Sequence, residues 1–222
     1  MQPFEWFIGK IFLTLFSVFG NYGITLILLS LVVNIILLPF YNFADNIQKK
    51  ERLVQEQMKP KIEEFKSVYK GYELYLYTNN VYRLHNYHPI YALRGLVSLL
   101  IQVPFFMGAY GFLSNYSGFQ GENFLFLSNL ATPDGLLSIN SLTINLLPFI
   151  MTGINLLAGY VYASGMQKNE KITIVIVALV FLVLLYNAPS SLLLYWTFNN
   201  IFSLIKNLYY KKSEAELLRG EI

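Results

Sequence analysis

Residues 24–40 have the sequence ITLILLSLVVNIILLPF, in which Asn34 is the one strongly polar side chain. An α-helix rises about 1.5 Å per residue, so about 20 apolar residues cross a hydrocarbon core of roughly 30 Å. Together with Tyr22 and Gly23, which precede it, this stretch is long enough to do so. We therefore predict a transmembrane helix over residues 22–40, and this helix decides the class of fold.

The composition of the whole chain also points to a membrane protein. Its 222 residues are 55% hydrophobic and 13% charged, with a mean hydropathy of +0.46. A water-soluble domain of this length needs many more polar residues to cover its surface. The net charge of only +3 argues against a nucleic-acid-binding protein, and the absence of cysteine excludes disulfides, thiolate metal sites and cysteine nucleophiles.

Four further apolar stretches extend the prediction to an all-α, polytopic protein with five transmembrane helices. They cover residues 89–113, 142–164, 172–189 and 190–209. The third of these is short, so we expect it to extend to about Pro189, to lie nearly upright or to sit in a thinned bilayer. Pro189 is expected to set the tight turn that follows. Tyr195 and Trp196 in the last span are expected to be packing or anchoring residues.

Two more segments are expected to be helical outside the hydrocarbon core. Residues 2–19 place their apolar side chains on one stripe at helical spacing, which predicts an amphipathic helix in the membrane interface. Lys10 interrupts the apolar run, which argues against a cleaved signal peptide. Residues 41–88 are too polar to insert, and we expect a cytoplasmic helical hairpin there, interrupted at Gly71 and near residues 78–80.

The distribution of Lys and Arg predicts the orientation of the chain. The segments over residues 41–88, 165–171 and 210–222 contain eight, two and three Lys or Arg residues, whereas 114–141 and 188–189 contain none. With five spans, these two groups of segments fall on opposite sides of the membrane. Cytoplasmic loops carry the excess of positive charge, so we predict that the N-terminus lies outside and the C-terminus in the cytoplasm.

The side chains needed for most membrane enzymes are missing from the predicted spans. No Asp or Glu lies within them, which argues against a proton-coupled carrier and an aspartyl intramembrane protease. His85 and His88 have no further ligand set beside them, so a structural or solvent-facing pair is favoured over a metal site. No histidine within a span can activate Ser or Thr. We therefore expect no catalytic residues, no metal and no cofactor.

Uncharged polar side chains are the unusual feature of the spans. An unpaired amide is costly in hydrocarbon, so these groups either hydrogen-bond between helices or line a cavity that holds water. Taken together in five short spans, they favour a partly hydrated interior. With Arg94, the candidate groove residues are Asn34, Arg94, Ser98, Gln102, Asn145, Asn155, Thr197 and Asn200.

Five stretches, in order along nearly the whole chain, resemble the signatures of the YidC-type membrane protein insertase family. They are GNYG at 20–23 followed by LILLSLVVNIILLP at 26–39, KPKIEEFKSVYKG at 59–71, LLIQVPFFMGAY at 99–110, NFLFLSNLATPDGLL at 123–137 and APSSLLLYWTFNNIFSLIKN at 188–207. Each stretch alone is a weak signal, but the order and the predicted topology also match. The chain is similar to the shorter form of the family, without a large extracytoplasmic domain.

The resemblance implies an insertase of the bacterial inner membrane. In this family a hydrated groove shelters the polar end of a nascent segment while its apolar part enters the bilayer. The implied partners are nascent membrane proteins, membrane lipids and, through the basic hairpin, the ribosome or a Sec translocon. The hairpin's charges are equally compatible with contact to anionic lipid or with a solvated surface.

One departure from the family pattern concerns positive charge. The family has an arginine where this chain has Asn34, and the resemblance implies that this arginine attracts acidic segments of the substrate. This chain instead carries Arg94, five residues after Pro89. If the first two spans are neighbours, Arg94 lies at a depth similar to that of Asn34 and can supply the charge. Alternatively, its long side chain extends to the cytoplasmic headgroups.

Two other functions remain open on the sequence alone. The same polar cavity suits a small polytopic transporter, or an accessory subunit that binds a lipid or polysaccharide precursor. A scaffold serving one partner complex is a further alternative, which Asn34 encourages. A transporter requires an outer gate and a defined small ligand, whereas an insertase contacts nascent membrane segments.

Overall fold

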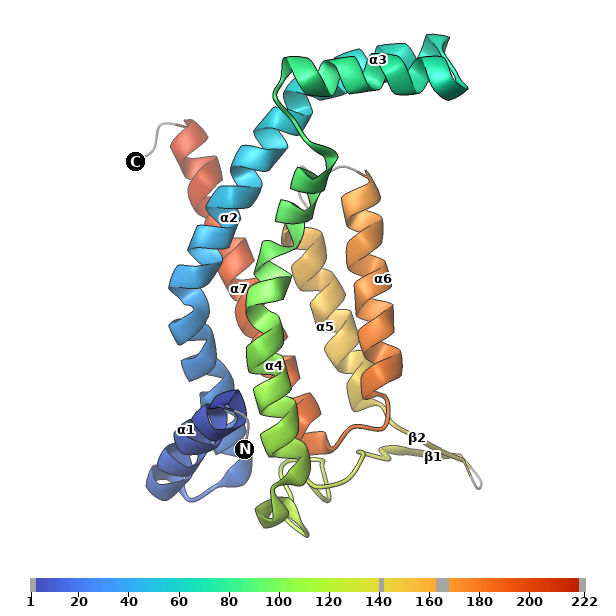
Figure 1. The fold of residues 1–222 in the computed structure, drawn as a ribbon. Helices are drawn as coiled ribbons and strands as arrows, with labels where there is room; N and C mark the ends of the chain where they lie inside the picture. The colour runs from blue at the N-terminus through green and yellow to red at the C-terminus, as the bar shows by residue number, and fades with distance from the viewer. Residues whose placement is uncertain (1–2, 140–141, 163–167, 220–222) are drawn as a thin grey trace. The chain divides into compact units, whose positions relative to one another are not determined.

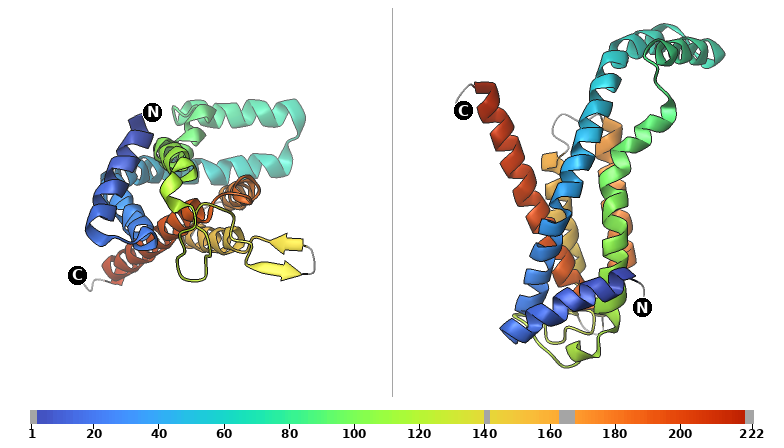
Figure 2. Two further views of the ribbon diagram at one scale, coloured as in Figure 1. Left: turned by 90° about the horizontal axis from the view of Figure 1, so that it is seen from below. Right: turned by 60° about the vertical axis from the view of Figure 1, so that its left-hand side comes forward.

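The computed structural model describes residues 3–139, 142–162 and 168–219, and their regular structure is mostly helical. The elements in chain order are α1 (Pro3–Phe19), α2 (Tyr22–Val68), α3 (Gly71–Leu84), η1 (Pro89–Leu96), α4 (Val97–Asn115), η2 (Ser117–Phe119), β1 (Leu137–Ile139), β2 (Leu142–Ile144), α5 (Leu147–Tyr162), α6 (Lys168–Leu185) and α7 (Ser190–Arg219) (Figure 1). The two short strands pair antiparallel, with Leu137 opposite Ile144 (Figure 2).

The chain forms two compact units, which are described separately. The first unit comprises Met1–Ile36 and Phe105–Ile222, and the hairpin unit comprises Leu37–Pro104. The helices α2 and α4 each contribute residues to both units.

The helix bounds differ from several predicted spans. By length and composition, α2 is the one described helix that is long and apolar enough to cross a membrane, whereas α5 and Lys171–Leu185 are shorter apolar helices. Residues 89–96 form a 3₁₀-helix ahead of α4, and residues 142–144 form β2 ahead of α5. The five-span topology therefore remains a prediction.

The hairpin unit confirms one predicted interruption and corrects the other. Gly71 has a positive φ of +57°, a conformation that glycine adopts readily, and it separates α2 from α3. The predicted break near residues 78–80 is wrong, because α3 continues to Leu84. Asparagine costs a helix only a few tenths of a kcal/mol, about 0.7 at most, and the buried Val81 holds this turn in place.

The two arms of the hairpin contact each other through aromatic rings. The Tyr69 and Tyr77 rings stack with centroids 4.3 Å apart, and Phe65 lies 5.2 Å from Tyr77. Offset stacking of this kind adds to the burial of apolar area. These contacts hold α3 against the end of α2.

The predicted helix is confirmed as α1, and the middle of its apolar stripe packs on the protein, whereas Val18 and Phe19 at its end are exposed. Phe12 is fully buried, with Phe112, Tyr116 and Phe119 ring centroids each 5.4 Å from its own. Gly108 permits the close approach of α4, because a Cβ there would lie 2.7 Å from the backbone of Phe4. The position of α1 in the membrane interface remains a prediction.

Within the first unit, α7 packs along α5 (Figure 2). Trp196 on α7 is 6% exposed, and its ring lies 4.5 Å from Phe106 and 5.6 Å from Phe181. These contacts agree with the packing role that the sequence predicts for this tryptophan. Pro189 lies directly before α7, in the short connection from α6.

Candidate functional site

The structure distributes the predicted groove residues over three places. Asn34, Asn155, Thr197 and Asn200 lie on α2, α5 and α7 of the first unit, Asn145 precedes α5, and Arg94 and Gln102 belong to the hairpin unit. Gln102 is half-buried on α4. Ser98 lies on the same helix, but its side chain falls outside the part of the chain that the structure describes.

Asn34 connects α2 to α7. Its side chain is 3% exposed, and its Nδ2 donates to the Ser30 carbonyl at 2.8 Å and to Oδ1 of Asn199. Nδ2 of Asn199 in turn donates to the Tyr195 carbonyl at 2.9 Å. The contact is an amide–amide bridge between two helices that are far apart in the sequence.

A second amide pair connects α5 to α7. Nδ2 of Asn155 donates to Oδ1 of Asn200 at 3.0 Å, and Nδ2 of Asn200 lies 3.5 Å from the Met151 carbonyl. About two turns further along α7, Asn207 donates to the Ala158 carbonyl at 3.2 Å. The neighbouring residues Asn199 and Asn200 thus bond to two different helices.

The hydrogen bonds of these residues can be compared with the two interpretations of the polar side chains, which were bonding between helices and lining a cavity that holds water. Asn34, Asn155 and Asn200 bond between helices, and the Thr197 hydroxyl donates to the Leu193 carbonyl of its own helix at 2.7 Å. Interhelical bonding is therefore observed for three of the predicted residues. A water-filled groove around them remains a proposal.

The amide bridge can be tested by double substitution. Asn34→Leu is expected to lower stability by about 0.5 to 2 kcal/mol, because it leaves the buried amide of Asn199 without its donor. Adding Asn199→Leu is expected to recover most of this loss, since both polar groups are then removed. Thermal unfolding of the purified variants in detergent measures both effects. Strictly additive losses in the double variant would contradict a direct bridge.

Asn145 has a structural position away from this set. Its Oδ1 accepts from the Gly135 N–H at 3.1 Å, and its Nδ2 donates to the Tyr186 carbonyl at 2.9 Å. Beside it, Oδ2 of the buried Asp134 accepts from the Leu146 N–H at 2.7 Å. These bonds join the loop before β1 to the start of α5 and the end of α6.

The same loop caps α7. The N–H groups of Ser190 and Ser191 donate to the carbonyls of Thr132 and Leu130 at 2.8 and 2.9 Å. The first N–H groups of a helix have no partner within it, so the 123–137 stretch supplies acceptors that α7 otherwise lacks.

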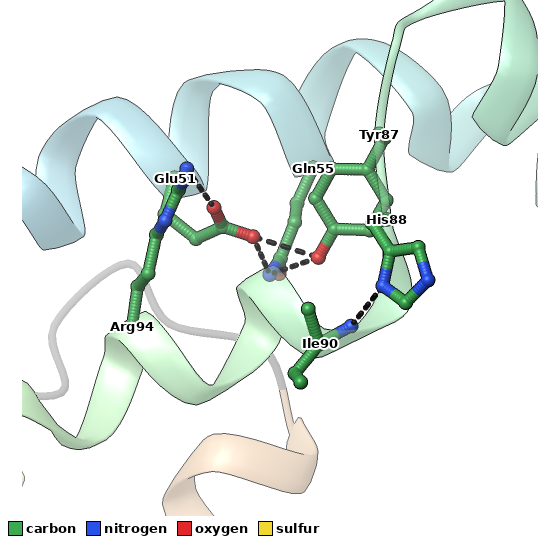
Figure 3. Close-up of polar contacts among 6 residues, drawn as sticks. All are labelled: Glu51, Gln55, Tyr87, His88, Ile90 and Arg94. Atoms are coloured by element: carbon green, nitrogen blue, oxygen red, sulfur yellow. Dashed lines mark hydrogen bonds and ion pairs between the residues drawn. The ribbon is translucent and has the colours of Figure 1, made fainter.

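The hairpin unit contains a charged cluster around Glu51 and Arg94. Oε2 of Glu51 lies 3.6 Å from Nη1 of Arg94, and Oε1 accepts from the Tyr87 hydroxyl at 2.7 Å and from Nε2 of Gln55 at 3.0 Å (Figure 3). The Arg94 guanidinium lies 4.0 Å from the centroid of the Tyr91 ring. Of these residues only Arg94 is predicted from the sequence as a site residue, because nothing in the local pattern around Glu51 indicates a distant partner.

Tyr87 and His88 take part in this region as hydrogen-bonding groups. Burial, and next the hydrogen bond to Glu51, raise the pKa of Tyr87 to about 12, so its hydroxyl stays protonated and donates at neutral pH. Nδ1 of His88 accepts from the Ile90 N–H at 3.3 Å and so caps η1 (Figure 3). Among the described residues, no group of His, Asp and Glu side chains is arranged to hold a metal ion.

Comparison with known proteins gives a family and a fold. The model of the family described as "60Kd inner membrane protein" matches residues 14–216. The chain is 31% identical over 228 residues to the membrane protein insertase YidC of Treponema denticola, covering 96% of this chain and 38% of that protein. It is 24% identical over 192 residues to the YidC of Leptospira interrogans, covering 83% of this chain and 30% of that protein.

A solved structure shares the fold. The crystal structure of an active YidC insertase with its first transmembrane domain resolved matches with a TM-score of 0.60 at 24% identity. The match covers 93% of this chain and 45% of the solved one. The chain therefore spans less than half the length of the curated relatives and the solved chain that it matches.

Proposed function

This chain belongs to the 60Kd inner membrane protein family, and from that membership we propose that it is a membrane protein insertase. The observation that carries the proposal is a match over residues 14–216, supported by relatives named membrane protein insertase YidC. We further propose that the chain lies in a bacterial inner membrane, as the family's description suggests. No covalent step and no cofactor is needed for this activity.

The proposed mechanism lowers the cost of moving polar groups through hydrocarbon. A charged residue at the centre of a bilayer costs about 2.5 to 3.5 kcal/mol on insertion scales. A groove that holds water reduces this cost for the polar end of a nascent segment, while its apolar part enters the lipid. Asn34, Asn155, Thr197 and Asn200 are proposed to supply polar groups to this groove, and exchange of their interhelical bonds for water or substrate would open it.

The direct test is depletion of the protein from its own cells. Membrane proteins that fail to integrate after depletion identify the substrates, and photocrosslinking from α2 or α7 to a stalled nascent segment identifies direct contact. Normal integration of all membrane proteins after depletion would contradict a general insertase. Crosslinks to the ribosome or a Sec translocon in the same experiment would identify those proposed partners.

A specialised scaffold is the second candidate, and Asn34 is the observation that favours it. The sequence resemblance implies an arginine at this position in insertases. Expression of this chain in cells depleted of their general insertase separates the two functions. Restored integration supports the insertase, whereas a well-expressed protein that restores nothing supports a scaffold for one partner complex.

The proposed orientation places residues 41–88 in the cytoplasm and residues 114–141 outside. Because the chain has no cysteine, single substitutions report the side directly. Ser67 and Ser128 are both exposed serines and form a matched pair. In intact spheroplasts an impermeant maleimide is expected to label Ser128→Cys and not Ser67→Cys, whereas both are labelled after lysis. Labelling of Ser67→Cys before lysis would overturn the topology.

A further inference from the structure

We propose that Glu51 sets the preference of this protein for the charge of its substrates, by holding Arg94 in an ion pair that competes with acidic segments of the incoming chain. The proposal rests on the proposed insertase function and adds to it a residue that determines specificity. Its basis is the charged cluster of the hairpin unit, defined as Glu51, Gln55, Tyr87, Tyr91 and Arg94. Figure 3 draws all of these residues except Tyr91.

Arg94 is an isolated charge in the last turn of η1, shortly before the apolar helix α4. It is the only Lys, Arg, Asp or Glu residue in the sequence between Arg83 and Glu122. Its side chain is 49% exposed, and its contact with Glu51 is a single one of 3.6 Å from Nη1. A guanidinium has five N–H donors in a planar fork, so one such contact leaves donors for a second carboxylate.

The stacking on Tyr91 holds Arg94 ready for such a second partner. Its guanidinium lies 4.0 Å from the ring centroid, the arrangement of a cation–π contact. A guanidinium held in this way loses little further freedom when it binds a carboxylate. Arg94 is therefore a preorganised binding point for an anionic side chain.

Glu51 differs from Arg94 because it is buried and held on several sides. Its side chain is 4% exposed, and its Oε1 accepts two hydrogen bonds, from Tyr87 and Gln55. Gln55 also donates to the Tyr87 hydroxyl at 3.3 Å, which closes a small network. The Glu51 carboxylate thus has a fixed place, and it reduces the net charge that Arg94 presents to any other anion.

The consequence is a competition between an internal and an external carboxylate. With Glu51 charged, the pair is neutral as a whole, and an acidic segment gains only the difference between two similar interactions. Without the charge of Glu51, the full positive charge of Arg94 is available. The protein as it stands is therefore tuned toward neutral segments, and removal of one carboxylate shifts it toward acidic ones.

The test compares two substrates that differ only in charge. Each is a single-span model protein whose translocated tail carries aspartates or asparagines at the same positions, and each is inserted into proteoliposomes that contain the full chain. Glu51→Gln keeps the size of the side chain and its amide oxygen can still accept from Tyr87. The ratio of acidic-tailed to neutral-tailed insertion is expected to rise about two- to fivefold, the size expected for an ion pair with a half-exposed partner.

Three further variants make the result specific. Glu51→Asp lengthens the ion pair and is expected to shift the ratio in the same direction by less. In an Arg94→Gln background, Glu51→Gln is expected to leave the ratio unchanged. Glu63→Gln is the matched control, because it removes a carboxylate of the same helix that pairs with Lys59 in an exposed position, and it is expected to leave the ratio at the parental value.

Every outcome decides the proposal. A rise in the ratio that requires Arg94 supports it. An unchanged or lower ratio in both Glu51 variants, or an equal rise without Arg94, overturns it. If the parent protein inserts neither substrate, the proposed insertase function has failed instead, and the neutral-tailed substrate makes the two failures distinguishable.

Discussion

Replacing Arg94 by glutamine is expected to reduce the insertion of acidic-tailed substrates about tenfold and to leave neutral-tailed substrates near the parental rate. Two opposite charges about 4 Å apart at an effective dielectric near 20 attract by roughly 4 kcal/mol before desolvation. A tenfold loss of insertion corresponds to about 1.4 kcal/mol of this attraction. The remainder is offset by desolvation and by the competing carboxylate of Glu51.

A structural side effect of Arg94→Gln must be separated from this loss. The substitution leaves the buried charge of Glu51 without its cation, and a buried charge that loses its partner destabilises a protein. The double variant Glu51→Gln, Arg94→Gln removes both charges together. It is expected to recover the stability of the parent while keeping the low insertion of acidic-tailed substrates.

A compensating substitution connects this prediction to Asn34, where the family pattern has an arginine. In the Arg94→Gln background, Asn34→Arg is expected to restore the insertion of acidic-tailed substrates, because it returns one positive charge to the proposed groove. Insertion rates are compared at equal protein levels. If Arg94→Gln inserts both substrates as the parent does, Arg94 serves no substrate and has only the structural role of its contacts with Glu51 and Tyr91.

Trp196→Ala is expected to lower stability by about 3 to 5 kcal/mol, the range for removing a large aromatic side chain from a packed core. The physical reason is the loss of two ring contacts, to Phe106 and Phe181, at a residue that is 6% exposed. A lower midpoint of thermal unfolding in detergent, and a lower yield, are the expected measurements.

Tyr209→Ala provides the matched control for Trp196. It removes an aromatic side chain from the same helix, but Tyr209 is 69% exposed, so little change in stability is expected. If Trp196→Ala instead unfolds at the parental temperature but no longer inserts substrates, Trp196 contacts the substrate rather than the core.

The sequence predicts the apolar helices better than it predicts where they begin. Residues 24–40 and the amphipathic stripe of α1 are long periodic signals, and both are confirmed as helices. The start of α5 at Leu147 was not predictable, because a short apolar run such as that of β2 fits a strand and a helix equally well. Pro39 and Pro60 usually indicate the end of a helix or a kink, so the sequence likewise did not predict that α2 continues through both over 47 residues.

Polar residues of the spans could be predicted, but their partners could not. Asn34 and Asn200 stand out in apolar surroundings, whereas the identity of the helix that each one meets depends on the rotation of several helices in space. The ion pair of Arg94 is a stronger case, because its partner Glu51 lies on a different helix among many other charged residues. Whether Arg94 acts on the same substrates as Asn34 stays a prediction that the compensating substitution tests.

The adjacent asparagines of α7 have a mechanical consequence. Successive residues of a helix point about 100° apart, so the side chains of Asn199 and Asn200 form hydrogen bonds with α2 and α5 in two different directions. A rotation of α7 about its own axis that relieved one bond would pull on the other. The rotation of α7 about its axis is thereby fixed, and the parts of α2, α5 and α7 within the first unit are expected to move as one rigid body while both bonds hold. Exchange of the bonds for water or substrate, as proposed for opening the groove, then has to release both asparagines.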